Sequence, residues 1–272
     1  MENRSDLKVP LYSRVTHDEH SAALKTWQVA TVGPHQLMLY PRIVRALKGI
    51  LTPASLLGEF GSGVGFVMEA IVSADPPLPY RLFLGLEINR ESRMEARELV
   101  TLDQAGIVEC DITNSHFPDG MFDVAVCSTV LCHFKPFPLR QALFHSIRML
   151  RPGGTMIVCV PSVEWVIREN TDYVVLEELG PKSFVALKQG NPLHLRQSYY
   201  AREVYAGFLR DTGFKIVESE ELTIPDINEI GNRYRKYAGF PLFYFFSVER
   251  PQDFKVPEIE LYDKNIPRIG GE

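Results

Sequence analysis

A glycine-rich segment at residues 56–66 constrains the fold of this chain more than any other feature. It reads Leu-Leu-Gly-Glu-Phe-Gly-Ser-Gly-Val-Gly-Phe, which predicts a strand, a tight turn and then a helix that begins at Phe66. Glycines are needed where the backbone adopts a positive φ or where a ligand approaches the main chain closely. The first turn of the following helix offers unpaired amides to an anionic group. The segment therefore predicts a ligand-binding corner between a strand and a helix.

Apolar runs along the rest of the chain alternate with segments of helical periodicity. Buried strands are predicted over Leu56–Phe60, Leu82–Leu86, Ile107–Cys110, Phe122–Cys127, Met156–Val160, Phe214–Val217 and Leu242–Val248. Helices are predicted over Phe66–Val72, Ser92–Val100, Leu139–Leu150 and Arg202–Asp211, and residues 151–154 should form the turn that ends the third of these. This alternation is typical of α/β proteins with a parallel sheet and helices on both faces.

Composition and charge exclude several classes of protein. The 272 residues are 45% hydrophobic and 23% charged, which indicates a globular chain. The net charge is −5 and Lys and Arg are nowhere concentrated, so we expect no nucleic-acid partner. No run approaches the roughly 18 apolar residues that cross a bilayer, and the polar start lacks the apolar region of a secretory signal. We therefore expect a cytoplasmic protein without a membrane span.

The four cysteines, Cys110, Cys127, Cys132 and Cys159, lack the paired spacing of a metal site. Most of them lie in apolar, strand-like runs, where a reduced thiol acts as a small hydrophobic group. We therefore expect no metal.

Two details of the glycine segment select the ligand. The dinucleotide fingerprint requires a third glycine at position 66, where this chain has Phe66. Glu59, directly before the loop, would repel a pyrophosphate but suits a cationic amino group. These details favour a ligand with a methionine-like ammonium, although a dinucleotide-dependent oxidoreductase remains an alternative.

Several segments, taken in order, resemble successive motifs of the class I S-adenosylmethionine (SAM)-dependent methyltransferases, among them the type 11-like small-molecule enzymes. They are Glu59–Gly65, Leu84–Asn89, Val108–Thr113, Phe117–Phe134 and Leu150–Thr155, and Tyr200–Phe214 extends the match. The resemblance implies a Rossmann-like three-layer α/β sandwich with a seven-stranded, mostly parallel sheet of order 3-2-1-4-5-7-6, strand 7 being antiparallel. It implies SAM as cofactor and S-adenosylhomocysteine (SAH) as product.

The resemblance also implies roles for residues at the strand ends. Glu59 would bind the methionine half of SAM, Glu87 both ribose hydroxyls, and Asp111 the adenine amino group, although Asp111 can equally cap a turn. The expected cofactor-binding set is Glu59, Gly61, Ser62, Gly63, Glu87, Ile88, Asp111, Ile112, Ser128 and Thr129. His133 is a candidate general base, because an imidazole near the methyl group can accept a proton from a hydroxyl, with local packing as the alternative.

The remaining segments predict the parts around the methyl acceptor. We expect an N-terminal helical lid at 1–50, with a helix over Leu37–Leu47 that is interrupted near Pro41, and the methyltransferase domain at 51–250. Within that domain 161–200 should be a substrate-cap insertion after the fifth strand, and 251–272 a C-terminal tail. Candidate substrate residues are Tyr40, Trp165, His194 and Tyr200, and Arg42 is a further candidate contact to the carboxylate of SAM.

The function that follows is in-line transfer of a methyl group from SAM to a small organic metabolite at oxygen, nitrogen or carbon. A non-catalytic SAM-binding protein of the same fold is a further alternative. The acceptor and the oligomeric state, a homodimer included, stay open at this point.

Overall fold

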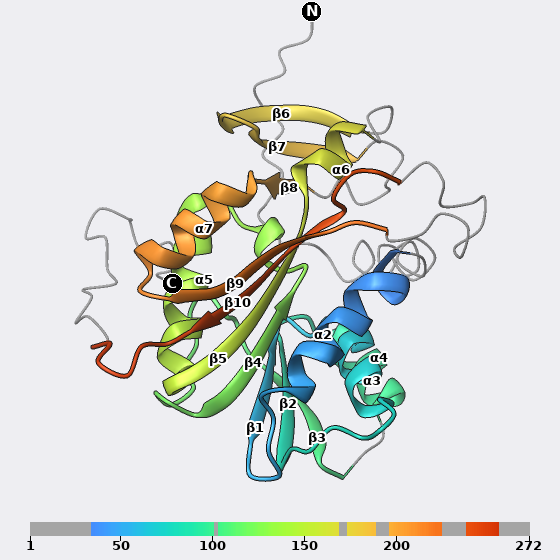
Figure 1. The fold of residues 1–272 in the computed structure, drawn as a ribbon, viewed down its shortest axis with the longest axis vertical. Coiled ribbons are helices and arrows are strands. Elements are labelled where there is room, and N and C mark those ends of the chain that lie inside the picture. The colour runs from blue at the N-terminus through green and yellow to red at the C-terminus, as the bar shows by residue number, and fades with distance from the viewer. Residues whose placement is uncertain (1–33, 101–102, 169–172, 189–195, 225–237, 256–272) are drawn as a thin grey trace, which may run out of the picture.

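Seven strands form one sheet in the computed structural model, which describes residues 34–100, 103–168, 173–188, 196–224 and 238–255. The strands are β1 (Leu56–Phe60), β2 (Leu82–Glu87), β3 (Ala105–Glu109), β4 (Phe122–Ser128), β5 (Leu150–Pro161), β9 (Lys215–Leu222) and β10 (Phe243–Glu249). Their order is β3-β2-β1-β4-β5-β10-β9 (Figure 1), and β10 is antiparallel to both of its neighbours. Counted within this sheet alone, the order is 3-2-1-4-5-7-6, so the expected topology is confirmed.

Helices cover both faces of the sheet (Figure 1). One layer holds α2 (Tyr40–Lys48), α3 (Phe66–Val72) and α4 (Arg90–Leu99), and the other holds α5 (Pro136–Met149) and α7 (Arg202–Asp211). Alternate side chains of the central strands enter the two cores, because successive residues of a strand point to opposite faces. On β5, for example, Met156 and Val158 pack with the α5 layer, whereas Ile157 and Cys159 pack with the α2 layer.

The start of the described chain differs from the expected interrupted helix. A π-helical turn, η3 (His35–Leu39), runs directly into α2, and Pro41 lies in the first turn of α2. An α-helix would crowd the proline ring against the carbonyl four residues earlier, and the wider π turn relieves that contact. The chain therefore keeps a continuous helix where the proline pattern predicts a break.

The turn expected at residues 151–154 is part of β5. Leu150 pairs with Phe122, the register then shifts, and Thr155 pairs with Val124. Gly153, with φ of 74°, lies within this irregularity. Pairing on both sides of the irregular step thus extends the strand back to the end of α5.

The insertion after β5 contains a second sheet. It begins with α6 (Val163–Arg168) and continues with the antiparallel strands β6 (Tyr173–Gly180), β7 (Ser183–Lys188) and β8 (Arg196–Tyr199). Figure 1 shows this sheet beyond the carboxyl end of β5, next to α6. The sequence predicts the insertion but not its strands.

Two kinds of feature are absent from the described ranges. None of the helices there is long and apolar enough to cross a membrane. The same ranges hold no group of three His, Cys, Asp or Glu side chains placed to bind a metal ion.

Candidate functional site

A cavity of about 400 Å³ lies at the carboxyl ends of β1 to β5, where open α/β sheets bind their ligands. It is lined by every residue of the expected cofactor set: Glu59, Gly61, Ser62, Gly63, Glu87, Ile88, Asp111, Ile112, Ser128 and Thr129. His133, Tyr40 and Trp165 line it too. His194, together with residues 1–33 of the expected lid and 256–272 of the tail, lies outside the described residues.

Glu59, near the end of β1, is a buried carboxylate that the Met68 backbone stabilises only in part. Its side chain is 1% exposed, and within the described part of the chain Oε2 has no hydrogen-bond partner. Burial raises its pKa well above the usual range, and the negative charge of Glu87 raises it further. A buried, unpaired carboxylate is costly. A cationic group in the cavity would remove that cost.

Glu87, the last residue of β2, is held in place by backbone amides. Its Oε2 accepts a hydrogen bond from Gly63 N at 2.8 Å, and its Oε1 accepts one from Asn89 N at 2.7 Å. Burial raises the pKa of Glu87, while the two amides and the Arg93 guanidinium oppose that rise. Since a carboxylate offers about four lone-pair positions, both oxygens keep capacity for ligand hydroxyls.

The glycine loop has no room for a side chain at Gly61 but has open space at Gly63. Gly61 has φ of 77°, and a Cβ there would lie 2.4 Å from Cγ2 of Val130. Gly63 has φ of 53°, and a Cβ there would meet nothing within 4 Å. Gly63 therefore borders open cavity space, which a side chain would fill. This is the cradle that a ligand in close contact with the backbone requires.

Asp111 caps the turn that follows β3. Its Oδ1 accepts hydrogen bonds from Thr113 N at 2.8 Å and from Thr113 Oγ1 at 2.7 Å. The structure thus realises the capping role, while contact with adenine stays a prediction. Asp111 and Ile112 both line the cavity, so the two roles are compatible.

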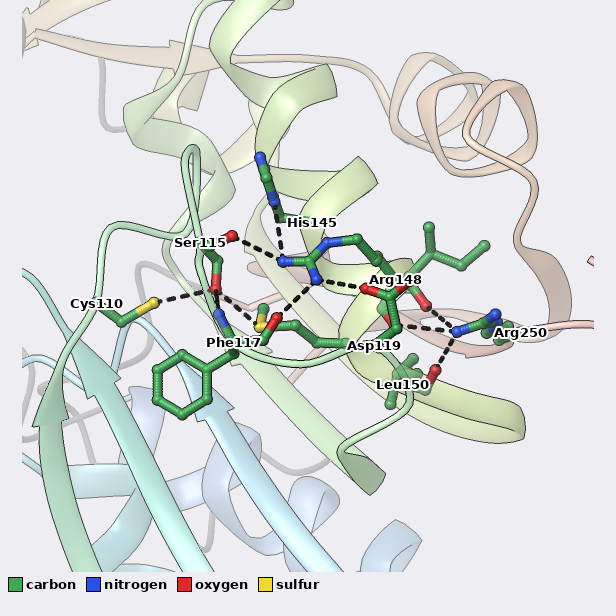
Figure 2. Close-up of polar contacts among 10 residues, drawn as sticks. Cys110, Ser115, Phe117, Asp119, His145, Arg148, Leu150 and Arg250 are labelled. Atoms are coloured by element: carbon green, nitrogen blue, oxygen red, sulfur yellow. Dashed lines mark hydrogen bonds and ion pairs between the residues drawn. The ribbon is translucent and has the colours of Figure 1, made fainter. Parts of the chain in front are cut away.

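Arg148 of α5 fastens the loop that continues from Asp111 (Figure 2). Its Nη1 donates to Phe117 O at 2.6 Å and to Asp119 Oδ1 at 2.5 Å, and its Nη2 donates to Ser115 O at 2.7 Å. Ser115 Oγ accepts from Cys110 Sγ at 3.5 Å, and Cys110 lines the cavity. Nothing in the local sequence pattern marks Arg148 for this role, because its partners lie about 30 residues away.

The far side of the cavity is formed by η4 (Leu131–His133), the insertion and the N-terminal helix. His133 lines it from η4, and Tyr173, Gln197 and Tyr199 line it from β6 and β8. The sequence did not single out Gln197. It lies two residues before Tyr199 on one strand, and that alternation is the signal that points to it.

The structure places two of the expected contact residues away from the cavity. Tyr200 does not line the cavity: its hydroxyl donates to Phe134 O at 3.1 Å and its ring packs on Tyr205, because it follows Tyr199 and faces the other way. Arg42 points away as well, since it pairs with Glu218 at 2.6 Å and with Glu220 at 2.8 Å on β9.

Comparisons with known proteins agree with this geometry. Residues 58–158 match the family described as methyltransferase domain. A demethylmenaquinone methyltransferase from Clavibacter sepedonicus is 28% identical over 204 residues, which are 72% of this chain and 75% of that protein.

Solved structures share the fold at low identity. The methyltransferase in complex with the Haloferax volcanii Trm112 methyltransferase activator has a TM-score of 0.65 at 16% identity, covering 88% of this chain and 98% of that one. The N-methyltransferase NodS from Bradyrhizobium japonicum, solved with SAH, has a TM-score of 0.54 at 14% identity, covering 78% and 86%.

Proposed function

We propose that this chain, whose residues 58–158 form a class I SAM-dependent methyltransferase domain, transfers a methyl group from SAM to a small organic acceptor at oxygen, nitrogen or carbon. One observation carries the proposal. The buried carboxylates of Glu59 and Glu87 flank a glycine loop at the ends of neighbouring strands, inside a cavity that extends to His133.

The residues present fit SAM. Glu59 would hold the ammonium of its methionine half, Glu87 the ribose hydroxyls, and Asp111 with Ile112 the adenine. Gly63 leaves room for close backbone approach, and Ser62 and Ser128 each bring a buried hydroxyl that has no partner among the described residues. When bound, SAM supplies the activated methyl group, so the protein needs no further electrophile.

The chain's own task is to position the acceptor and exclude water. Side chains from η4, α6 and β8 enclose the cavity beyond the strand ends, and aligned reactants avoid much of the entropic barrier. For a hydroxyl acceptor, we assign the proton to the His133 imidazole. Burial and the charges of Glu59 and Glu69 raise the pKa of the Tyr40 phenol, which favours its protonated form and makes His133 the better candidate base.

The residues assigned to SAM line the same cavity as His133 and Tyr199, so an acceptor that binds beside SAM must be small. A cavity of about 400 Å³ lies within the range of small-molecule sites, roughly 300 to 1,000 Å³. The Clavibacter relative is named for an organic acceptor, demethylmenaquinone. Because Trp165 and Gln197 line the cavity, we assign the described part of the insertion at 161–200 as the substrate cap, and because Tyr40 lines it, we assign the described part of residues 1–50 as the lid.

Parallel calorimetric titrations with SAM, SAH and NADH test the proposal. Binding of SAM and SAH without NADH is the expected result. Binding of NADH alone would support an oxidoreductase instead. If the protein binds both adenosyl ligands but transfers no methyl group to any acceptor in a metabolite extract with labelled SAM, it is a non-catalytic SAM-binding protein.

A further inference from the structure

We infer that the far side of the cavity is a subsite for a flat, uncharged aromatic acceptor, held against a wall formed by His35, Tyr40 and Trp165. The inference rests on the proposed function, because it names the acceptor class of the same site. All three side chains line the cavity, and all come from elements outside the glycine loop and its strands.

The π-helical turn is what brings two of these rings together. Residues five apart on an α-helix point about 140° away from each other, since each residue turns by about 100°. In η3 the Tyr40 amide bonds to the His35 carbonyl, five residues back, so the two residues lie one above the other. Their rings lie 6.1 Å apart between centroids. The unusual turn thus places both side chains on the cavity wall.

Trp165 completes the wall from α6. Its amide donates to Ser162 Oγ at 3.0 Å, which anchors the start of that helix at the end of β5. The Trp165 ring lies 6.2 Å from His35 and 5.2 Å from Phe243, and His35 lies 4.7 Å from Phe243. Phe243 is fully buried behind them. The wall is therefore formed in the absence of an acceptor. Contact between aromatic rings is the main interaction that it can make with one.

The charges of the cavity select against anionic acceptors. Among the described residues that line it, none is Lys or Arg, two are histidines (His35 and His133), and Glu59, Glu87 and Asp111 are acidic. A carboxylate or phosphate on the acceptor would lose its water without gaining a cationic partner, at a large cost. Further rings line the same space, from Phe134, Tyr173 and Tyr199. An uncharged aromatic acceptor suits both the lack of Lys and Arg in the lining and the rings that surround the space.

The test compares two probes on the full chain saturated with SAH. 2-Naphthol is the uncharged probe, and 6-hydroxy-2-naphthoate is the same ring system with one carboxylate. We expect 2-naphthol to bind at least about tenfold more tightly in calorimetry, since an unpaired buried charge exceeds the roughly 1.4 kcal/mol that tenfold represents. Equal affinity for the two probes, or no binding of 2-naphthol, would overturn the inference.

Variants locate the subsite. His35→Ala and Trp165→Ala should each weaken 2-naphthol binding by about fivefold or more, whereas Phe137→Ala, a ring that is 57% exposed on α5, should leave it unchanged. Gln197→Lys places a cation in the cavity and should improve binding of the naphthoate. Unchanged 2-naphthol affinity in both wall variants would contradict the assignment.

The affinity for SAH distinguishes a misfolded variant, a failure of the proposed function and a failure of the inference. A variant that still binds SAH has folded, and the comparison of the two probes on the unaltered protein does not depend on any variant. If the unaltered protein does not bind SAH, the proposed function fails and the inference fails with it. If SAH binds and 2-naphthol does not, the inference alone fails.

Discussion

The backbone amide of Gly63 donates a hydrogen bond of 2.8 Å to Oε2 of Glu87. This contact joins the glycine loop after β1 to the end of β2, so the loop and the acid hold each other in position. Glu87 is 7% exposed and receives a second amide from Asn89 at 2.7 Å. The two parts of the site that we assign to different portions of SAM are thereby one unit. A change in either part is expected to affect the other.

Glu87→Gln should weaken SAH binding by about 10- to 100-fold. The variant replaces an ionised acceptor by a neutral amide, and hydrogen bonds to charged groups contribute about 1.5–3 kcal/mol each. Calorimetric titration with SAH measures the loss. Glu98→Gln, on the exposed side of α4, is the matched control and should bind normally. Normal SAH affinity in Glu87→Gln would show that this carboxylate does not bind the ribose.

Gly61→Ala should mainly lower the stability of the protein, whereas Gly63→Ala should mainly lower its affinity for SAH. At Gly61 the new methyl would lie 2.4 Å from Val130, so we expect a loss of about 2–3 kcal/mol in unfolding free energy. A methyl group added at Gly63 would meet no atom within 4 Å, so the loss in unfolding free energy should be only about 1 kcal/mol. The Gly63 methyl nevertheless enters the cradle, so SAH binding should fall sharply.

Chemical denaturation and SAH titration of the two glycine variants separate these effects. If Gly63→Ala binds SAH as tightly as the unaltered protein, the ligand does not approach the loop at that residue.

Glu59→Gln should change how the stability of the ligand-free protein depends on pH. Burial and Glu87 raise the pKa of Glu59 above the ordinary carboxyl pKa of 4.5. At pH values between the two, the folded protein therefore binds a proton at Glu59 that the unfolded chain does not. The unaltered protein therefore loses up to about 1.4 kcal/mol per pH unit from this group as pH rises toward the raised pKa. The variant lacks this loss, so the stability difference between variant and unaltered protein should grow from pH 5 to pH 8.

Thermal melts across that pH range measure the difference, with Glu98→Gln as the control. Whatever constant offset the buried amide brings, the two stability curves should diverge with pH. Parallel curves would mean that Glu59 is ionised in the ligand-free fold. SAH binding should be weaker in Glu59→Gln, because the ammonium loses its counter-charge, and the difference should shrink as pH falls and Glu59 of the unaltered protein becomes protonated.

Arg148→Ala should destabilise the protein by about 2–3 kcal/mol and weaken SAH binding. The variant removes the fork that holds Ser115, Phe117 and Asp119, and it leaves main-chain carbonyls without their donor (Figure 2). Arg148→Lys should restore little, since an ammonium cannot reproduce the planar fork. Urea denaturation with SAH titration is the measurement.

Arg151→Ala is the matched control for the loop. Arg151 pairs with Asp123 at 2.5 Å, but its side chain is 51% exposed, so its removal should cost less than about 1 kcal/mol. An equal loss in the two arginine variants would argue that Arg148 acts only as another surface charge.

The sequence by itself determined the alternation of strands and helices and the residues expected at the cofactor end of the site, whereas the order of the strands followed from the family resemblance. The glycine loop, the acids at 59 and 87 and the alternating strands and helices are local patterns, and each lies within a few residues of the element that it marks. The bounds of β1, α3 and α7 agree with the predicted Leu56–Phe60, Phe66–Val72 and Arg202–Asp211. Local signals of this kind are sufficient because parallel strands bring their carboxyl ends to one edge of the sheet.

Only the tertiary structure decided the acceptor end. Which of Tyr199 and Tyr200 faces the cavity depends on strands of an inserted sheet that the sequence did not reveal. The pairing of Arg42 with β9 and the hydrogen bonds of Arg148 to the loop after Asp111 both depend on residues distant in the chain. Such contacts leave no periodic signal, because packing between distant segments, and not the preference of any single segment, sets their geometry.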